Sequence, residues 1–260
     1  MNCGKSSDMK QKSNIILNYL SPFLTFILLF GIWEWAVTRF EVPRWILPTP
    51  SSILQTMVTD FQDFWPHILV TFETVLIGFL IAVPVGILMA TIITSNRTVS
   101  AALSPFVIFL VTTPLVTLLP IMMLFLGFGQ KVRIIGVVIQ AFAIVNMNTV
   151  TGILNVPSVR HELMQTLGAN KISRLRHVIY PTAAVDIFTG VRLAAIFSTT
   201  TCISAEYVAG NEGLGSQIIK HSQFLRTTES FACIFYVTLI GLFMYGLVTF
   251  VQKKVIYWRT

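Results

Sequence analysis

Charged side chains are scarce in this sequence. Asp, Glu, Lys and Arg make up 11% of its 260 residues, whereas soluble domains carry about 25%. Hydrophobic residues make up 54%, and the mean hydropathy is +0.75. This composition excludes an ordinary soluble domain and is typical of a helical protein that crosses a membrane several times.

Motifs of catalytic sites are also absent. The sequence contains no GxxxxGK[ST] phosphate-binding loop, no HExxH zinc motif and no GxSxG nucleophile motif. Cys3, Cys202 and Cys233 form no CxxC pair, so they are interpreted as free thiols, and the four scattered histidines suggest no metal site. "GNEGLG" (Gly210 to Gly215) follows an apolar segment and is interpreted as an exposed turn. We therefore expect no catalytic residue and no metal ligand in this chain.

The net charge of +7 has two interpretations. Basic proteins often bind nucleic acid, but in a membrane protein Lys and Arg gather on the cytoplasmic side. We favour the second and expect no nucleic-acid partner. With both termini in the cytoplasm, the residues on that side are Lys5, Lys10, Lys12, Arg97, Arg160, Lys171, Arg174, Arg176, Lys253, Lys254 and Arg259. The smaller set outside is then Arg39, Arg44, Lys131, Arg133, Lys220 and Arg226.

Six apolar segments are long enough to span a membrane, which takes about 20 residues. They cover roughly residues 15–38, 68–94, 102–127, 132–154, 182–208 and 230–252. The first is too long for a signal peptide and is expected to remain as an anchor. The sequence therefore predicts an all-α polytopic membrane protein with six transmembrane helices, in a single domain over 1–260 with its core at about 68–252.

The segment "LPTPSSILQTMVTDFQDF" separates the first two spans. Ser51 is expected to cap a helix after two prolines. Apolar residues then recur at helical spacing, which predicts one amphipathic helix at the membrane interface. They are Ile53, Met57, Phe61 and Phe64.

Small and polar residues mark the inner faces of the spans. Gly78, Ala82, Gly86 and Ala90 share one helix face, which allows a neighbouring helix to approach closely. Thr112-Thr113-Pro114 predicts a bend or break, either an ordinary kink or one that lines a pathway. Polar groups at membrane depth usually face a cavity, although Ser and Thr also bond their own helix. The candidate pathway residues are Thr113, Asn148, Thr199, Thr200 and Glu206.

The 158–181 segment is polar within an apolar chain. Ser158 is expected to cap a first helix with an apolar stripe, and Gly168 fits the left-handed position that ends a helix. Asn170 is expected to cap a second short helix, which Pro181 closes. The stripes are Val159, Leu163, Met164 and Leu167, then Ile172, Leu175, Val178 and Ile179. Two capped amphipathic helices at a glycine corner favour a docking element for a partner over a solvated loop.

The 158–181 segment also resembles a known family. Glu162, Gly168, Ala169, Val178 and Pro181 match the E-A-A-x-x-x-G-A…V-x-L-P loop of ABC importer permeases, with Leu163, Met164 and Tyr180 departing from it. "LPTPS", "TPLVTLLPIMMLFLGFG", "TGVR" and "AEYVAGNEGLG" agree along nearly the whole chain. The sequence is thus similar to permeases for aliphatic sulfonates, taurine, nitrate or thiamine-type pyrimidine precursors.

The resemblance implies a type I importer fold in a bacterial inner membrane. Two permease copies would enclose the pathway, beside two ATPase subunits, an extracytoplasmic substrate-binding protein and membrane lipid. ATP and Mg would bind the ATPase subunits, with no cofactor in this chain. The 158–181 segment would be the cytoplasmic coupling loop, whose expected contact residues are Glu162, Gly168, Ala169, Lys171, Arg174, Arg176 and Pro181; the three basic ones would meet the ATPase or anionic lipid.

Three other classes of protein fit the sequence less well. The coupling component of an energy-coupling-factor vitamin importer would carry Ala-Arg-Ser/Gly motifs, which are missing. An ion-driven secondary transporter would show inverted repeats with paired acids, but Glu34, Glu73 and Glu206 show no repeat relation. A membrane enzyme would need a catalytic constellation.

Overall fold

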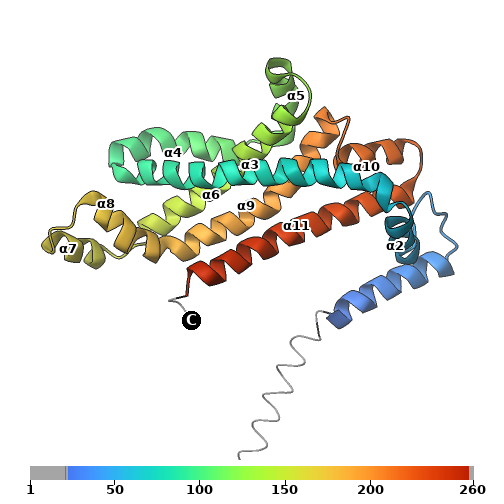
Figure 1. Cartoon of the computed structure of the whole chain (residues 1–260), viewed down its shortest axis with the longest axis horizontal. Coiled ribbons are helices and arrows are strands. Elements are labelled where there is room, and N and C mark those ends of the chain that lie inside the picture. Colours follow the sequence, from blue (N-terminus) through green and yellow to red (C-terminus); the bar gives the residue numbers. More distant parts are fainter. Residues whose placement is uncertain (1–20, 22, 258–260) are drawn as a thin grey trace, which may run out of the picture. The chain divides into compact units, whose positions relative to one another are not determined.

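The computed structural model describes residue 21 and residues 23–257, and its regular secondary structure there is entirely helical. A helix over residues 23–39 precedes the labelled elements of Figure 1. These are α2 (Pro50–Thr59), α3 (Phe61–Ser95), α4 (Arg97–Thr112), α5 (Leu115–Leu126), α6 (Gln130–Leu154), α7 (Ser158–Thr166), α8 (Lys171–Arg174), α9 (Tyr180–Ala209), α10 (Leu214–Gln223) and α11 (Thr227–Val255), with a π-helical turn at Leu175–Ile179. The described residues divide into two compact units: those up to residue 61 together with 221–232, and residues 62–220 together with 233–257.

Four helices within the described residues are long and apolar enough to cross a membrane: α3, α6, the continuous helix Lys171–Ala209, and α11. The bent pair α4 and α5 makes a fifth if it counts as one span. The first predicted span, 15–38, lies partly outside the described residues. The prediction of several apolar membrane helices is confirmed, and six spans remain the expectation from the sequence.

The larger unit is built on close contacts of α6 with α3 and α9. A side chain on Gly78 or Gly86 of α3 would collide with Val137 or Val145 of α6. The small-residue face predicted for the second span therefore does bring two helices together. α6 and α9 lie side by side (Figure 1), and Gly152 of α6 meets α9 in the same way.

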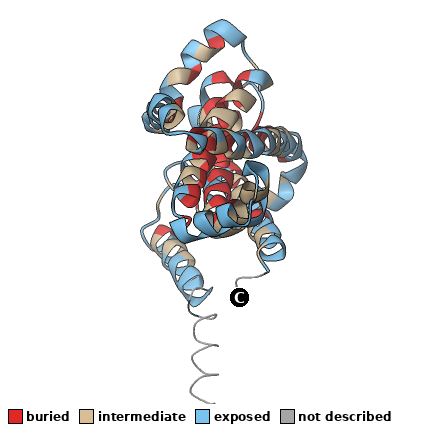
Figure 2. Ribbon diagram, turned by 90° about the vertical axis from the view of Figure 1, so that its left-hand side faces the viewer, coloured by how far each residue is buried: buried red, intermediate tan, exposed pale blue. Residues whose placement is uncertain are grey.

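Apolar side chains also cover the outside of the helices. Figure 2 shows buried residues gathered where helices meet, whereas outward faces are exposed. Large exposed hydrophobic residues on those faces include Leu80, Leu88, Phe106, Phe109, Leu239 and Leu242. Outer faces of this kind are stable in lipid, because acyl chains solvate them as well as a protein core does.

The third predicted span breaks sharply at Pro114. α4 and α5 are bent by 101°, and Thr113 between them is extended at ψ 121°. A residue before proline avoids the helical region, which explains the break. Pro105 and Pro120 lie inside their helices without ending them. The structure thus shows a break at this position, and its role in lining a pathway stays a prediction.

Two predictions for the segment between the first two predicted spans are wrong. Ser51 lies inside α2, and Thr49 is its N-cap, accepting a bond from the Ser52 amide at 3.3 Å. Pro50 occupies the first helical turn, where its missing N–H costs no bond. Ser51 instead donates its hydroxyl to Glu34 at 2.7 Å.

The amphipathic stripe predicted between the first two spans is divided between two helices. α2 ends at Thr59 with Asp60 as its C-cap. Phe61 and Phe64 therefore belong to α3. The apolar residues keep their helical spacing across the end of α2, so hydrophobicity alone does not reveal that the helix ends there.

Candidate functional site

α7 ends in a left-handed corner at Gly168. The glycine has φ +68°, its amide donates to the Gln165 carbonyl, and the Ala169 amide donates to the Met164 carbonyl, both at 3.0 Å. This pair of bonds is the Schellman arrangement, which satisfies carbonyls at a helix end. The predicted conformation of Gly168 is confirmed. The corner turns the chain from α7 toward α8.

The cap of α8 is confirmed, whereas the cap of α7 is not as predicted. The Asn170 side chain accepts from the Ser173 amide at 2.7 Å. Ser158, by contrast, is already inside α7, and Pro157 is the N-cap without a side-chain bond. The Pro157 carbonyl accepts the Arg160 amide at 3.0 Å, so the helix begins one residue earlier than the serine rule suggests.

Pro181 does not close the second helix. α8, the π turn and α9 form one continuous helix over Lys171–Ala209. A proline inside a helix removes an amide and crowds the preceding turn. The π turn at Leu175–Ile179 ends two residues before Pro181 and widens the helix there, and π turns often occur at functional sites. The second half of the 158–181 segment, from Lys171 onward, therefore belongs to the same helix as a membrane span.

The apolar stripe of α7 faces away from the rest of the chain. Val159, Leu163 and Leu167 follow one another at four-residue spacing and are 70%, 58% and 71% exposed. Glu162 lies on the same helix and is exposed too, whereas Met164 and Ala169 are half-buried. Such a helix carries the pattern that inserts its apolar face into a partner's groove.

Two side-chain bonds fix the base of the 158–181 segment to the membrane helices. The Tyr180 hydroxyl bonds the Thr91 hydroxyl of α3 at 2.8 Å. Arg160 donates to the Thr182 hydroxyl of α9 at 2.6 Å. Tyr180 is one of the departures from the family loop, and this structure gives it a partner that leucine could not supply.

Lys171 and Arg174 share a cavity with the end of α3, which is also lined by Thr91, Thr94 and Ser95. Arg176 lines a different, mainly apolar cavity together with Pro181. The three basic residues that the sequence groups together thus line two different cavities.

A second polar centre is built on the fully buried Glu206 of α9. Thr71 of α3 donates its hydroxyl to the two carboxylate oxygens at 2.8 and 3.1 Å. The Gly215 amide donates to Oε2 at 2.7 Å. Arg133 of α6, itself 4% exposed, places Nη1 3.7 Å from Oε1. One carboxylate thus joins α3, α6, α9 and the start of α10, as buried charges require partners.

The 210–215 loop wraps this carboxylate. Gly213 and Gly215 are buried, and a side chain on Gly213 would overlap the Glu206 carboxylate. The Leu214 amide donates to the Thr71 hydroxyl at 2.9 Å. The prediction of an exposed turn is therefore wrong for 213–215: the glycines are required by close approach to a buried charge.

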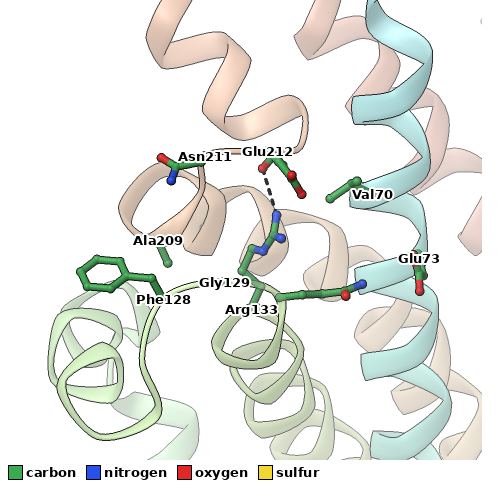
Figure 3. Close-up of a pocket in the computed structure, with 9 residues that line it drawn as sticks. Val70, Glu73, Phe128, Gly129, Arg133, Ala209, Asn211 and Glu212 are labelled. Atoms are coloured by element: carbon green, nitrogen blue, oxygen red, sulfur yellow. Dashed lines mark hydrogen bonds between the residues drawn. The ribbon is translucent and has the colours of Figure 1, made fainter.

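Arg133 also borders an open cavity of about 330 Å³, shown in Figure 3. Its Nη1 donates to the Glu212 carbonyl at 2.9 Å, the dashed bond in the figure. Glu73, Phe128 and Asn211 surround the space. The sequence places Arg133 on the extracytoplasmic side of the membrane, and the charge count does not reveal that its side chain is buried. One feature of the sequence does indicate a buried pair: Arg133 lies near the start of one apolar span, and the oppositely charged Glu206 lies in another.

The five candidate pathway residues are not brought together by any bond between described residues. Thr113 is half-buried at the α4–α5 break, and Thr200 is exposed on α9. Asn148 is half-buried against Gly190, and Thr199 is buried facing Gly241. The hydroxyls of Thr113 and Thr199 bond carbonyls of their own helices. Glu206 lies in the closed cluster described above.

Comparison with known proteins gives consistent matches. A family described as "Binding-protein-dependent transport system inner membrane component" matches residues 82–257. The taurine transport system permease protein of Escherichia coli is 27% identical over 90% of this chain and 88% of its own. The formylaminopyrimidine transport permease protein of Halalkalibacterium halodurans is 26% identical over 92% and 96%.

A solved structure shares the fold. The crystal structure of an amino acid ABC transporter with histidines superposes with a TM-score of 0.63 at 18% identity, covering 77% of this chain and 97% of the other.

Proposed function

The chain belongs to the family of binding-protein-dependent transport system inner membrane components, and on that premise we propose that two copies of it form a pathway opened and closed by two ATPase subunits. Family membership makes it an ABC importer permease with the type I fold, and a transport component rather than an enzyme. In the proposal, ATP and Mg bind the ATPase subunits. An extracytoplasmic binding protein delivers the solute.

The exposed α7 stripe is the single observation that carries this proposal. Val159, Leu163 and Leu167 present apolar surface on a helix that is capped at a rigid corner. Exposed apolar patches of this kind mark protein interaction sites. We infer that the 158–181 segment is the coupling loop and that the ATPase groove covers this stripe. Glu162, Gly168 and Ala169 shape it, and the uninterrupted helix through Pro181 transmits its movement into α9.

The transported solute is proposed to be a small anion or a compound resembling a thiamine precursor. Relatives named for taurine and for formylaminopyrimidine transport support this range. Thr113, Asn148, Thr199 and Thr200 are proposed to contact the solute; Thr200 is exposed and Thr113 is half-buried at the α4–α5 break. Alanine at those two positions should lower uptake while ATPase co-purification stays unchanged. Unchanged uptake would assign them to structure.

The proposed orientation places both termini and the 158–181 segment in the cytoplasm of the bacterial inner membrane. Lys253 and Lys254 in the last turn of α11 support it, because cytoplasmic ends of spans are enriched in Lys and Arg. Labelling single cysteines in this segment from either side of sealed vesicles would test it.

The coupling role is tested at Gly168. No atom lies within 4 Å of a side chain built there, so bulk is tolerated and only the φ of +68° is restrictive. Gly168→Val should deform the corner, since a left-handed conformation costs L-residues roughly 1–2 kcal/mol. We expect at least five-fold lower uptake and weaker retention of the ATPase subunits.

Gly168→Asn is the matched control, because asparagine adopts the left-handed conformation more readily. It should retain most of the uptake. If both variants transport and co-purify as the parent does, the corner has no coupling role.

A further inference from the structure

An apolar cavity of about 370 Å³ lies where α9 leaves the 158–181 segment. It is lined by Ile87 of α3, by the start of α9 and by Val255 at the end of α11; the lining residues from α9 are Tyr180, Pro181, Ala184, Ile187 and Phe188. Most of these groups are hydrocarbon or aromatic. The cavity therefore suits an apolar chain.

Arg176 supplies the one charged side chain in this lining. It comes from the π turn, is exposed, and makes no hydrogen bond or ion pair with any residue that the structure describes. Lys253 and Lys254 directly precede Val255, and both are exposed. A cavity with an apolar interior and a cluster of cations near it is complementary to a molecule with a hydrocarbon chain and an anionic head.

The walls of the cavity are held in place without a ligand. The Tyr180 hydroxyl is bonded to Thr91 at 2.8 Å, so its ring is fixed between α3 and α9. Lys254 lies over the ring of Phe250, 4.6 Å from its centre, which ties that cation to the end of α11. Arg176, which lines the cavity itself, is free to meet a ligand.

We propose that this cavity binds an anionic phospholipid, with one acyl chain among Ile87, Ile187 and Phe188 and the phosphate at Arg176. Guanidinium groups pair well with phosphate because their planar donors match its oxygens. Basic residues beside a span attract anionic lipid in the same way. The site gives Arg176 a role distinct from Lys171 and Arg174, which line another cavity.

The site has a mechanical consequence. Arg176 lies in the π turn between the α7 corner and the membrane part of α9. A lipid held there anchors the segment at the membrane surface. When α7 moves, α9 would then pivot at the lipid-bound Arg176.

The test measures lipid retention on the full-length permease alone, so it does not depend on the proposed transport function. The chain is purified from nanodiscs containing equal parts of phosphatidylglycerol and phosphatidylcholine, and bound lipid is quantified by mass spectrometry. Arg176→Gln should lower retained phosphatidylglycerol at least five-fold. Ala184→Leu, which fills the cavity, should lower it without removing a charge.

Arg174→Gln is the control, since it removes a neighbouring cation outside this cavity, and it should retain phosphatidylglycerol. Equal retention by parent and Arg176→Gln would overturn the proposal, as would equal binding of phosphatidylcholine. Full displacement by soluble glycerol phosphate would also overturn it, because it would assign Arg176 to a free phosphate. If Arg176→Gln keeps phosphatidylglycerol and instead loses the ATPase subunits in a separate co-purification, the proposal is overturned and the residue belongs to that interface.

Discussion

Glu206 is the residue on which the buried polar contacts of α3, α6 and α9 converge. A carboxylate removed from water needs several donors, and here Thr71, Gly215 and Arg133 surround it. The cluster accounts for polar groups that would otherwise be costly inside apolar helices. It also explains why Glu206 is better described as a structural centre of this fold than as an accessible pathway group.

Replacing Glu206 tests this interpretation. Glu206→Gln keeps the size of the side chain but leaves Arg133 buried without its counter-charge. Breaking one side of a buried pair costs about 3–5 kcal/mol, so thermal unfolding in detergent should occur at a clearly lower temperature. Glu73→Gln, at the exposed rim of the neighbouring cavity, should leave unfolding unchanged.

The partner assignment is tested by a double variant. Glu206→Gln with Arg133→Gln removes both charges, so its destabilisation should be smaller than the sum of the single effects, with a coupling of about 1–3 kcal/mol. Strictly additive effects would mean that the Arg133–Glu206 pair, 3.7 Å apart, contributes nothing to the free energy of unfolding.

Gly215 is constrained by the same carboxylate. A Cβ there would lie 2.7 Å from the Cβ of Glu206 and 2.9 Å from the Ile203 carbonyl oxygen. Gly215→Ala should therefore destabilise the protein by about 1–3 kcal/mol, the usual cost of overpacking. Gly246→Ala is the matched control, because no atom lies within 4 Å of its added carbon. Similar unfolding temperatures for the two variants would contradict this account.

At the scale of elements, the break between α4 and α5 depends on Pro114. The residue before it, Thr113, is extended because proline disfavours a helical conformation there. Pro120 has no such effect, since it lies within α5 and its preceding residue remains helical. The same residue type thus has different consequences at two positions of one apolar segment.

Pro114→Ala should let α4 and α5 straighten from their bend of 101°. Spin labels at the exposed positions Ala101 and Leu124 would report a longer and broader distance distribution. Pro120→Ala should leave the distribution unchanged. If Pro114→Ala also leaves it unchanged, packing against α6 and α9 holds the bend.

At the scale of the whole molecule, the exposed stripe of α7 is the surface expected to join the permease to its ATPase. Replacing Val159, Leu163 and Leu167 together by serine removes that apolar surface, so ATPase retention should fall at least ten-fold. The unfolding temperature should be the same as that of the parent protein, because these side chains contact little of their own chain. Gln165→Ser, on the same helix, is the control. Full retention by the triple variant would place the interface elsewhere.

The sequence by itself determined the class of protein and the local geometry of the 158–181 segment. Its hydropathy required membrane helices, and family motifs pointed to a permease. The Gly168 corner and the Asn170 cap depend on hydrogen bonds between residues at most five apart in the chain. Such bonds are fixed by residue type and spacing, so they can be predicted without the fold.

Only the tertiary structure decided the buried cluster and the course of the helices around it. Thr71 and Glu206 are separated by 135 positions, and nothing local to either shows that they meet. The packing of the helices leaves Arg133 buried and closes the 210–215 loop on the Glu206 carboxylate. It also lets one helix continue through Pro181 with a π turn in it. Burial supplies the reason: a charge shielded from water takes its partners from whichever helices packing brings within reach.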